Sequence, residues 1–246
     1  MHVLHSHCRV PHVKTSALQA YRSVQSAATS VLEDLGPTLD AGDTERTVAQ
    51  RCANLLRQRG LPDTWYYDCP AFVLLGSRSC VSVSGKHYQP GDEVVGQCNL
   101  ITVDLSPIRD GIWGDCARSF CVESGRWASS PATAQFVEGL SIERALHEWL
   151  RTFATLDRTA GELFAAANAR INHAGYENLD FAGNVGHSIA TRREDRIFIE
   201  HGASVRLGDL GLFTFEPHIR RRDVGRWGFK HENIYAFDDT GALVEI

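Results

Sequence analysis

The chain has 246 residues, of which 43% are hydrophobic and 22% charged, a composition typical of a soluble globular protein. Its formal charge of −5 comes from mixed acidic and basic residues, so nothing in the charge pattern favours nucleic-acid binding. No segment resembles a membrane span or an export signal, and seven cysteines without Cys-x-x-Cys spacing favour free thiols. We therefore expect a cytoplasmic protein without a membrane partner.

Residues 1–14 are expected to form a loose N-terminal tail. Helical spacing of apolar residues then begins at Thr15 and continues to about Glu33, before Gly36-Pro37 ends the pattern. Asp43 is the expected cap of a second helix that extends to Gly60. The alternative for the tail is a metal site formed by its four histidines, His2, His5, His7 and His12.

The remaining elements follow in an order that repeats. Strand signals occupy residues 71–75, 99–105 and 114–122. Pro131 then begins a long helix, and Gly175 ends the helix after it. Strand signals return at residues 211–219, 232–237 and 242–246. Since the order helix, helix, strands occurs twice, we predict one α+β domain over residues 15–246.

Acidic residues occupy two of the predicted strands. Asp104 lies within the apolar residues 101–105, and Glu216 lies within the apolar residues 212–216. Aspartate is uncommon in strands, and a buried carboxylate without a partner is costly. Strand alternation places Thr102 with Asp104, and Thr214 with Glu216, on the faces opposite the apolar residues. Both acids are therefore expected to face a site rather than the core.

A second acid in each half strengthens this prediction. Asp115 and Glu232 stand near the beginnings of two further strands. If the halves pack together, four carboxylates converge and repel one another unless cations neutralise them. Each acid taken singly could instead form a buried salt bridge or cap a turn. Together they predict two divalent ions, with manganese expected and iron, cobalt or zinc as alternatives.

Five local segments resemble the pita-bread metallopeptidases, a superfamily that includes methionine aminopeptidase, Xaa-Pro aminopeptidase, prolidase and creatinase. The matching segments are VDL (103–105), GDCARSF (114–120), GHSI (186–189), FTFEP (213–217) and KHEN (230–233). The spacings between their acids and histidine resemble the Xaa-Pro aminopeptidase branch most. This resemblance covers residues 15–246. It implies two pseudo-symmetric helix-helix-strand halves around a curved, mostly antiparallel sheet.

The resemblance also implies a role for each matched residue. Asp104 would chelate one metal ion, His187 and Glu216 would hold the other, and Asp115 and Glu232 would bridge both. A bridging water or hydroxide would attack an amide carbonyl, and Glu216 would move its proton.

One substrate-contacting residue departs from the family. Typical relatives carry a histidine seven residues after the metal-binding histidine, and this chain has Glu194 there. An ionised glutamate cannot donate a hydrogen bond to an oxyanion. His201 and His218 are alternative donors, and His87 is the candidate for an upstream histidine of the family. Each of the three histidines could equally be a surface or packing residue.

Further expectations concern the surroundings of the site. Lys230 stands where relatives often carry arginine, and it would orient a ligand carboxylate. The Xaa-Pro branch has a large N-terminal domain without a counterpart in these residues, so specificity is expected from loops or from another subunit, and a homodimer would fit. Aromatic residues are candidates for lining the pocket, with core packing as the alternative for each: Trp65, Tyr66, Tyr67, Trp113 and Trp227.

The predicted function is that of a dinuclear metallohydrolase, by resemblance an aminopeptidase of Xaa-Pro type that acts on a peptide or small amide. One alternative is a creatinase-like or biosynthetic enzyme with a small non-peptide C–N substrate. The other is a pita-bread module that binds peptides without catalysis. Relatives of that last kind usually lose several metal ligands, whereas all five ligand types are present here. The natural substrate, the physiological ion and the oligomeric state stay open.

Overall fold

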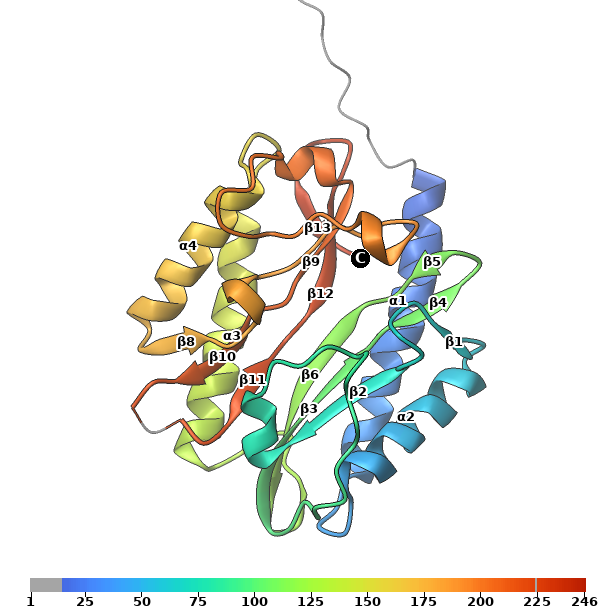
Figure 1. The fold of residues 1–246 in the computed structure, drawn as a ribbon, viewed down its shortest axis with the longest axis vertical. Coiled ribbons are helices and arrows are strands. Elements are labelled where there is room, and N and C mark those ends of the chain that lie inside the picture. The colour runs from blue at the N-terminus through green and yellow to red at the C-terminus, as the bar shows by residue number, and fades with distance from the viewer. Residues whose placement is uncertain (1–14, 224) are drawn as a thin grey trace, which may run out of the picture.

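The computed structural model describes residues 15–223 and 225–246, so the four tail histidines lie outside the described residues. The fold has two halves with the same order of elements (Figure 1). Helices α1 (Thr15–Leu35) and α2 (Glu45–Gln58) accompany the strands of the first half. Helices α3 (Ala134–Phe153) and α4 (Ala160–His173) accompany those of the second half. The predicted α+β class is therefore confirmed.

The first half is built on an antiparallel sheet in the order β2-β3-β6-β7. A smaller sheet in the order β1-β4-β5 stands beside it. Ile101, Val103 and Leu105 of β3 are buried in one cluster with apolar residues of α1 and α2, as alternation predicts. The strands of this half are β1 (Asp63–Thr64), β2 (Ala71–Leu75), β3 (Cys98–Leu105), β4 (Pro107–Arg109), β5 (Ile112–Trp113), β6 (Cys116–Glu123) and β7 (Arg126–Trp127).

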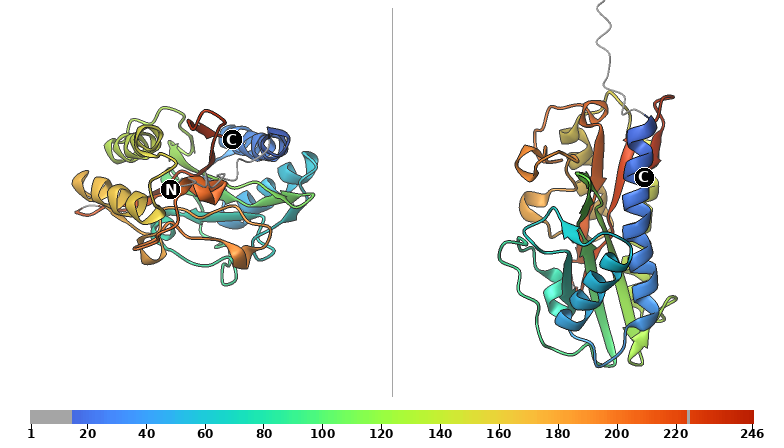
Figure 2. Two further views of the ribbon diagram at one scale, coloured as in Figure 1. Left: turned by 90° about the horizontal axis from the view of Figure 1, so that it is seen from above. Right: turned by 90° about the vertical axis from the view of Figure 1, so that its right-hand side faces the viewer.

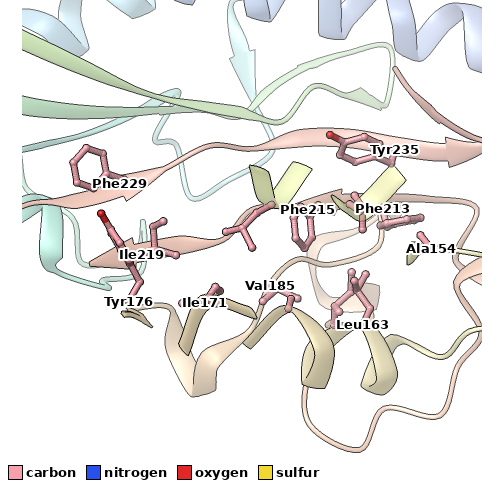
Figure 3. Packing of buried hydrophobic residues seen from close by; sticks show 14 of the residues in the cluster. Ala154, Leu163, Ile171, Tyr176, Val185, Phe213, Phe215, Ile219, Phe229 and Tyr235 are labelled. Atoms are coloured by element: carbon pink, nitrogen blue, oxygen red, sulfur yellow. The ribbon is translucent and has the colours of Figure 1, made fainter. Parts of the chain in front are cut away.

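The second half contains two three-stranded antiparallel sheets, in the orders β13-β12-β9 and β11-β10-β8. Phe213 and Phe215 of β9 point toward the side where Leu163 of α4 and Val185 lie (Figure 3). The strands of this half are β8 (Tyr176–Asn178), β9 (Leu212–Phe215), β10 (His218–Arg221), β11 (Gly228–Lys230), β12 (Asn233–Phe237) and β13 (Leu243–Glu245). Seen from above, α1 and α3 lie on the same side of the strands (Figure 2).

In three predicted strands, the predicted bounds are wrong at the position of an acid. The predicted strand 114–122 begins only at Cys116, so Asp115 lies in the short break between β5 and β6. The predicted strand 211–219 is interrupted at Glu216 and Pro217, because proline has no N–H for the ladder. Glu232 precedes β12 and instead forms an isolated bridge with Ala117 of β6, which links the two halves.

Helix boundaries follow local capping chemistry. Thr44 caps α2 in a capping box, so the predicted cap at Asp43 is wrong. Asp43 instead pairs with Arg51 at 2.6 Å. The predicted beginning of α3 at Pro131 is also wrong, since the helix begins at Ala134. Helix α1 ends at Leu35, just before Gly36 and Pro37, as predicted, and these two residues begin a 3-10 turn.

Two predictions from composition can be checked on the described residues. The six cysteines in this part of the chain are free thiols. None of the described helices is long and apolar enough to cross a membrane.

Candidate metal centre

A cavity of about 430 Å³ is lined by side chains from both halves. Its volume falls within the range of small-molecule sites. The wall on the strand side includes Thr102 and Asp104, which lie on the face of β3 opposite the buried Ile101 and Val103. Alternation in β3 therefore turns its one acid away from the helices and into the cavity.

The structure brings all five predicted metal ligands to this cavity: Asp104, Asp115, His187, Glu216 and Glu232. Potential ligand atoms of Asp115, His187 and Glu232 lie within 4.8 Å of one another. The Nε2 atom of His187 is 3.5 Å from Asp115 Oδ2 and 3.6 Å from Glu216 Oε1. Side chains from three distant stretches of sequence therefore meet around one point.

His187 is oriented by its neighbours along β9. Its backbone N–H donates to Thr214 Oγ1 at 3.0 Å, and Thr214 N–H donates to its carbonyl at 2.8 Å. Gly186 permits this close pairing, because a Cβ atom there would lie 2.1 Å from Thr214 O. The Nδ1 atom of His187 lies 3.0 Å from Ser188 O, which can only accept a hydrogen bond. Nδ1 therefore carries the proton, and Nε2 presents its lone pair to the acids.

The bridging candidates are held through their backbones. Gln25 of α1 brackets Asp115, donating to its carbonyl at 2.7 Å and accepting from its N–H at 2.9 Å. Glu232 exchanges two backbone hydrogen bonds with Ala117, and Arg118 donates to its carbonyl at 2.8 Å. Both carboxylates are thus directed into the cavity while their own oxygens stay available.

Lys230 enters the same cluster from β11. Its Nζ atom lies 2.6 Å from Asp104 Oδ2, 3.0 Å from Glu216 Oε2 and 3.6 Å from Glu232 Oε2. Burial alone would lower the pKa of this ammonium group, but the three carboxylates raise it well above its ordinary value. Lys230 is therefore charged at neutral pH.

Asp115 and Glu232 are compensated less, since Lys230 approaches Glu232 only at 3.6 Å and forms no ion pair with Asp115 among the described residues. Asp115 is 3% exposed and Glu232 is 1% exposed. Asp115 Oδ2 and both carboxylate oxygens of Glu232 have no hydrogen-bond partner among the described residues. Burial raises the pKa of both groups well above ordinary values, and repulsion from neighbouring carboxylates adds to the shift. In their ionised form, carboxylates buried in this way require a cation, and without one they tend to keep their protons.

The donor set fits a divalent transition-metal ion. It combines carboxylate oxygens with one imidazole, a mixture that suits manganese, iron, cobalt or zinc. Burial lowers the pKa of His187 to about 4, so its imidazole is neutral and in the metal-binding form at neutral pH. The orphaned oxygens of Asp115 and Glu232 lie beside that imidazole, and the residues present therefore fit such an ion.

The other candidate substrate residues are dispersed. His87, Glu194 and His201 are exposed and do not line the cavity. His218 does line it, but its Nε2 atom lies 2.6 Å from Ser79 O and must donate there. Burial lowers the pKa of His218 to about 4, so the ring is neutral and its Nδ1 atom can only accept a hydrogen bond. None of these side chains offers a donor to the cavity.

The predicted aromatic residues divide between the cavity and the core. Trp65, Tyr66 and Tyr67 line the cavity. Trp113 lies behind it and stacks on Trp65, with ring centroids 4.3 Å apart. Trp227 is a core residue packed in the second-half cluster, so its predicted pocket role is wrong.

Charged residues that the sequence analysis did not predict also line the cavity, among them Arg196 and Asp180. The guanidinium of Arg196 lies 5.1 Å from the Trp65 ring and 5.2 Å from the Phe198 ring, and Arg196 Nε donates to a backbone carbonyl at 3.0 Å. Asp180 lines the cavity and accepts a hydrogen bond from Phe181 N–H at 2.6 Å. Burial, together with the charge of Glu216, raises the pKa of Asp180 to about 6. Both residues lie in irregular segments, where no periodic pattern marks a side chain as facing a site.

Comparisons with known proteins agree with this architecture. The X-Pro aminopeptidase from Thermotoga maritima MSB8 is 18% identical over 95% of this chain and 61% of its own, with a TM-score of 0.77. The prolidase from Pyrococcus furiosus is 18% identical over 94% of this chain and 64% of its own, with a TM-score of 0.74. The methionine aminopeptidase from Rickettsia prowazekii is 14% identical over 95% of this chain and 97% of its own, with a TM-score of 0.69.

These likenesses confirm the predicted pita-bread fold. The chain spans less than two thirds of the length of the X-Pro aminopeptidase and the prolidase. No curated protein sequence matches it. The profile of metallopeptidase family M24 matches residues 19–239, and the chain therefore belongs to metallopeptidase family M24.

Proposed function

We propose that this protein is a metal-dependent aminopeptidase of Xaa-Pro type that hydrolyses an amide bond in the described cavity. One observation supports this above all: beside the neutral imidazole of His187, buried oxygens of Asp115 and Glu232 have no hydrogen-bond partner within residues 15–223 and 225–246. Two divalent ions, with manganese as the first candidate, would be held by the five converging side chains. Asp115 and Glu232 would lie between the ions, Asp104 on one side, and His187 and Glu216 on the other.

When bound, divalent ions of this kind lower the pKa of water and polarise a carbonyl group. Glu216 is the residue proposed to move the proton. Burial alone would raise its pKa, but the charge of Lys230 outweighs that effect and lowers the pKa below its ordinary value. Its carboxylate is therefore ionised, with Oε1 accepting from Thr214 Oγ1 at 3.2 Å. Glu216 can take a proton at Oε1 and return it to the leaving amine.

The substrate would lie against the aromatic wall of the cavity. Trp65, Tyr66 and Phe198 offer ring faces that suit the pyrrolidine ring of a proline residue. Arg196 would supply the hydrogen-bond donors that Glu194 cannot supply, since a guanidinium carries five N–H groups. Its position over Trp65 and Phe198 directs that charge at the cavity.

Hydrolysis by the reloaded full chain tests the proposal. The protein is stripped with a chelator, reloaded with Mn²⁺ and offered Ala-Pro, an Xaa-Pro tripeptide, an N-acetylated Ala-Pro and creatine. We expect cleavage of a free Xaa-Pro substrate and loss of more than about 100-fold in kcat/KM on Asp115→Asn, because substitutions of residues that merely orient ligands already cost 10–100-fold. Asp209→Asn, a matched change at an exposed position, should have no effect.

Three outcomes contradict the proposal. Turnover of creatine but not of peptides would favour the alternative function, an enzyme that acts on a small non-peptide C–N substrate. Metal binding without any hydrolysis would favour a binding module. Undiminished cleavage by Asp115→Asn would remove the proposed site itself.

A further inference from the structure

A second cavity lies at the junction of helix α3 and strand β6. Its volume of about 390 Å³ falls within the range of small-molecule sites. Its lining includes several residues of α3 together with Arg118 and Ser119 of β6. This cavity and the one at the metal centre share no lining residue in the part of the chain that the structure describes. A ligand bound in the second cavity would therefore not occupy the proposed metal site.

Glu143 of α3 presents an unpaired carboxylate oxygen to this second cavity. The residue is only 4% exposed, and a buried carboxylate without partners is costly. Its Oε1 atom accepts a hydrogen bond from the Ser119 hydroxyl at 2.8 Å, whereas its Oε2 atom has no partner within residues 15–223 and 225–246. Burial raises the pKa of Glu143 to about 7, although the Ser119 hydrogen bond and two nearby arginines lower it. The carboxylate thus has room for a cationic partner that the described residues do not supply.

Two arginines of the same cavity also carry charges without an acidic partner among the described residues. The Arg118 guanidinium donates to three oxygens, each at 2.8 Å: Ala117 O, Glu232 O and Asn233 Oδ1. These bonds engage three of its five N–H groups, so the group is fixed in place and two donors remain for a ligand. The side chain of Arg144 is exposed and forms no hydrogen bond or ion pair within the described residues. Both guanidinium groups can therefore receive an anionic group.

These charges define the class of ligand that the second cavity can accept. A simple anion would meet the carboxylate of Glu143, and a simple cation would meet two guanidinium groups. A zwitterion satisfies both, since its carboxylate can accept from the arginines and its ammonium group can donate to Glu143 Oε2. His231, the remaining titratable residue of the lining, is neutral because burial lowers its pKa well below the ordinary value.

Apolar residues complete the lining and indicate the kind of side chain that would fit. Pro131, Val137 and Leu140 line the cavity beside the charged groups. Val137 is 48% exposed, which is high for a large aliphatic side chain on a helix. An aliphatic group on the ligand would remove this apolar surface from water.

We propose that the second cavity binds a free aliphatic α-amino acid. The carboxylate of the ligand contacts Arg118 and Arg144, and its ammonium group donates to Glu143 Oε2. Its side chain packs on Val137 and Leu140. This inference goes beyond the proposed peptidase activity and does not depend on it. An aminopeptidase releases free amino acids, so the proposed activity would itself supply such a ligand.

Calorimetric titration of the full chain with L-leucine tests the inference. At about pH 8 most of the Glu143 carboxylate is ionised. Wild-type protein should bind leucine with a dissociation constant of about 1 mM or tighter. 4-Methylpentanoate lacks the ammonium group and 3-methylbutylamine lacks the carboxylate, so each should bind at least about tenfold more weakly. Glycine, which lacks the aliphatic side chain, should also bind about tenfold more weakly.

Two substitutions assign the polar contacts. Glu143→Gln keeps the size of the side chain and removes its charge, so it should weaken leucine binding by about tenfold or more and change 4-methylpentanoate binding by less than about threefold. Arg144→Met, at an exposed position where folding should be unaffected, should weaken the binding of both ligands by about threefold or more. Glu148→Gln on α3 and Arg22→Met on α1 are matched changes at exposed positions, and both variants should bind leucine as wild type does.

A further variant separates the two cavities. Asp180→Asn changes a side chain that lines the cavity of the metal centre, and it should alter the leucine dissociation constant by less than about threefold. Lack of saturable leucine binding, undiminished binding in folded Glu143→Gln or in Arg144→Met, or loss of binding in Asp180→Asn would each overturn the inference. Equal affinity for leucine and 4-methylpentanoate would also overturn it. If Glu143→Gln fails to fold, the Arg144→Met result decides. None of these outcomes depends on whether the protein cleaves peptides.

Discussion

Replacing Glu232 should stabilise the metal-free protein, and the gain should grow with pH. The pKa of Glu232 is raised well above its ordinary value of 4.5, first by burial and then by repulsion from Asp115 and Glu216. Above pH 4.5 the unfolded chain has lost this proton while the folded chain still holds it. Stability therefore falls as pH rises toward the folded-state pKa. Glu232→Gln removes the titrating group and hence this loss.

The size of the effect follows from linkage. In that pH window one retained proton changes the free energy of unfolding by about 1.4 kcal/mol per pH unit. For a chain of this length, about 1 kcal/mol corresponds to 2–4 °C in Tm, so the melting temperatures should diverge by about 3–6 °C per pH unit. A buried glutamine amide without partners costs about 1–3 kcal/mol, but that cost does not depend on pH. The slope of the Tm difference against pH is therefore the diagnostic quantity.

Calorimetric melting in a chelator between pH 5 and pH 8 measures this slope. The difference in Tm between Glu232→Gln and wild type should increase steadily with pH, whereas Glu33→Gln, at an exposed position on α1, should give a constant difference. Excess Mn²⁺ should reverse the order, because the wild-type carboxylate then binds an ion. A difference that is constant, or that shrinks with rising pH, would refute the claim that the folded metal-free protein keeps Glu232 protonated.

Three further substitutions test how the site is supported. Gly186→Ala would place a Cβ atom 2.1 Å from Thr214 O. We therefore expect the free energy of unfolding to fall by about 2 kcal/mol or more, and Mn²⁺ binding to be impaired. An unchanged melting temperature would mean that the backbone adapts. Thr159→Ala removes the capping box of α4 and should lower the free energy of unfolding by about 1 kcal/mol without changing the metal content. A change in metal content would show that α4 influences the site. Glu194→His should alter kcat/KM by less than about twofold, since Glu194 is exposed and outside the cavity lining, and a large gain would show that its segment reaches the substrate.

Local periodicity was sufficient to place the four long helices and the main strands. A buried face recurs every 3.6 residues in a helix and every second residue in a strand, so the pattern is present in the sequence itself. The exact ends of the helices were harder to predict. Asp43 and Thr44 are both favourable N-cap residues for α2, and the backbone conformation shows that Thr44 is the cap. The acids were also visible locally, since a carboxylate inside the apolar strand around Asp104 contradicts the pattern of its neighbours.

Contacts between distant residues were decided by tertiary structure alone. Lys230 and Asp104 are 126 positions apart, yet their side chains form an ion pair. Glu194 was a candidate because of its offset from His187, but an offset does not tell whether a loop turns toward the cavity. His87 and His201 were alternative histidines and also lie outside the cavity lining. Arg196 and Asp180 reach the cavity from irregular segments without any such signal. A sequence pattern records which face of an element is buried, whereas the distance between two side chains depends on how separate elements pack.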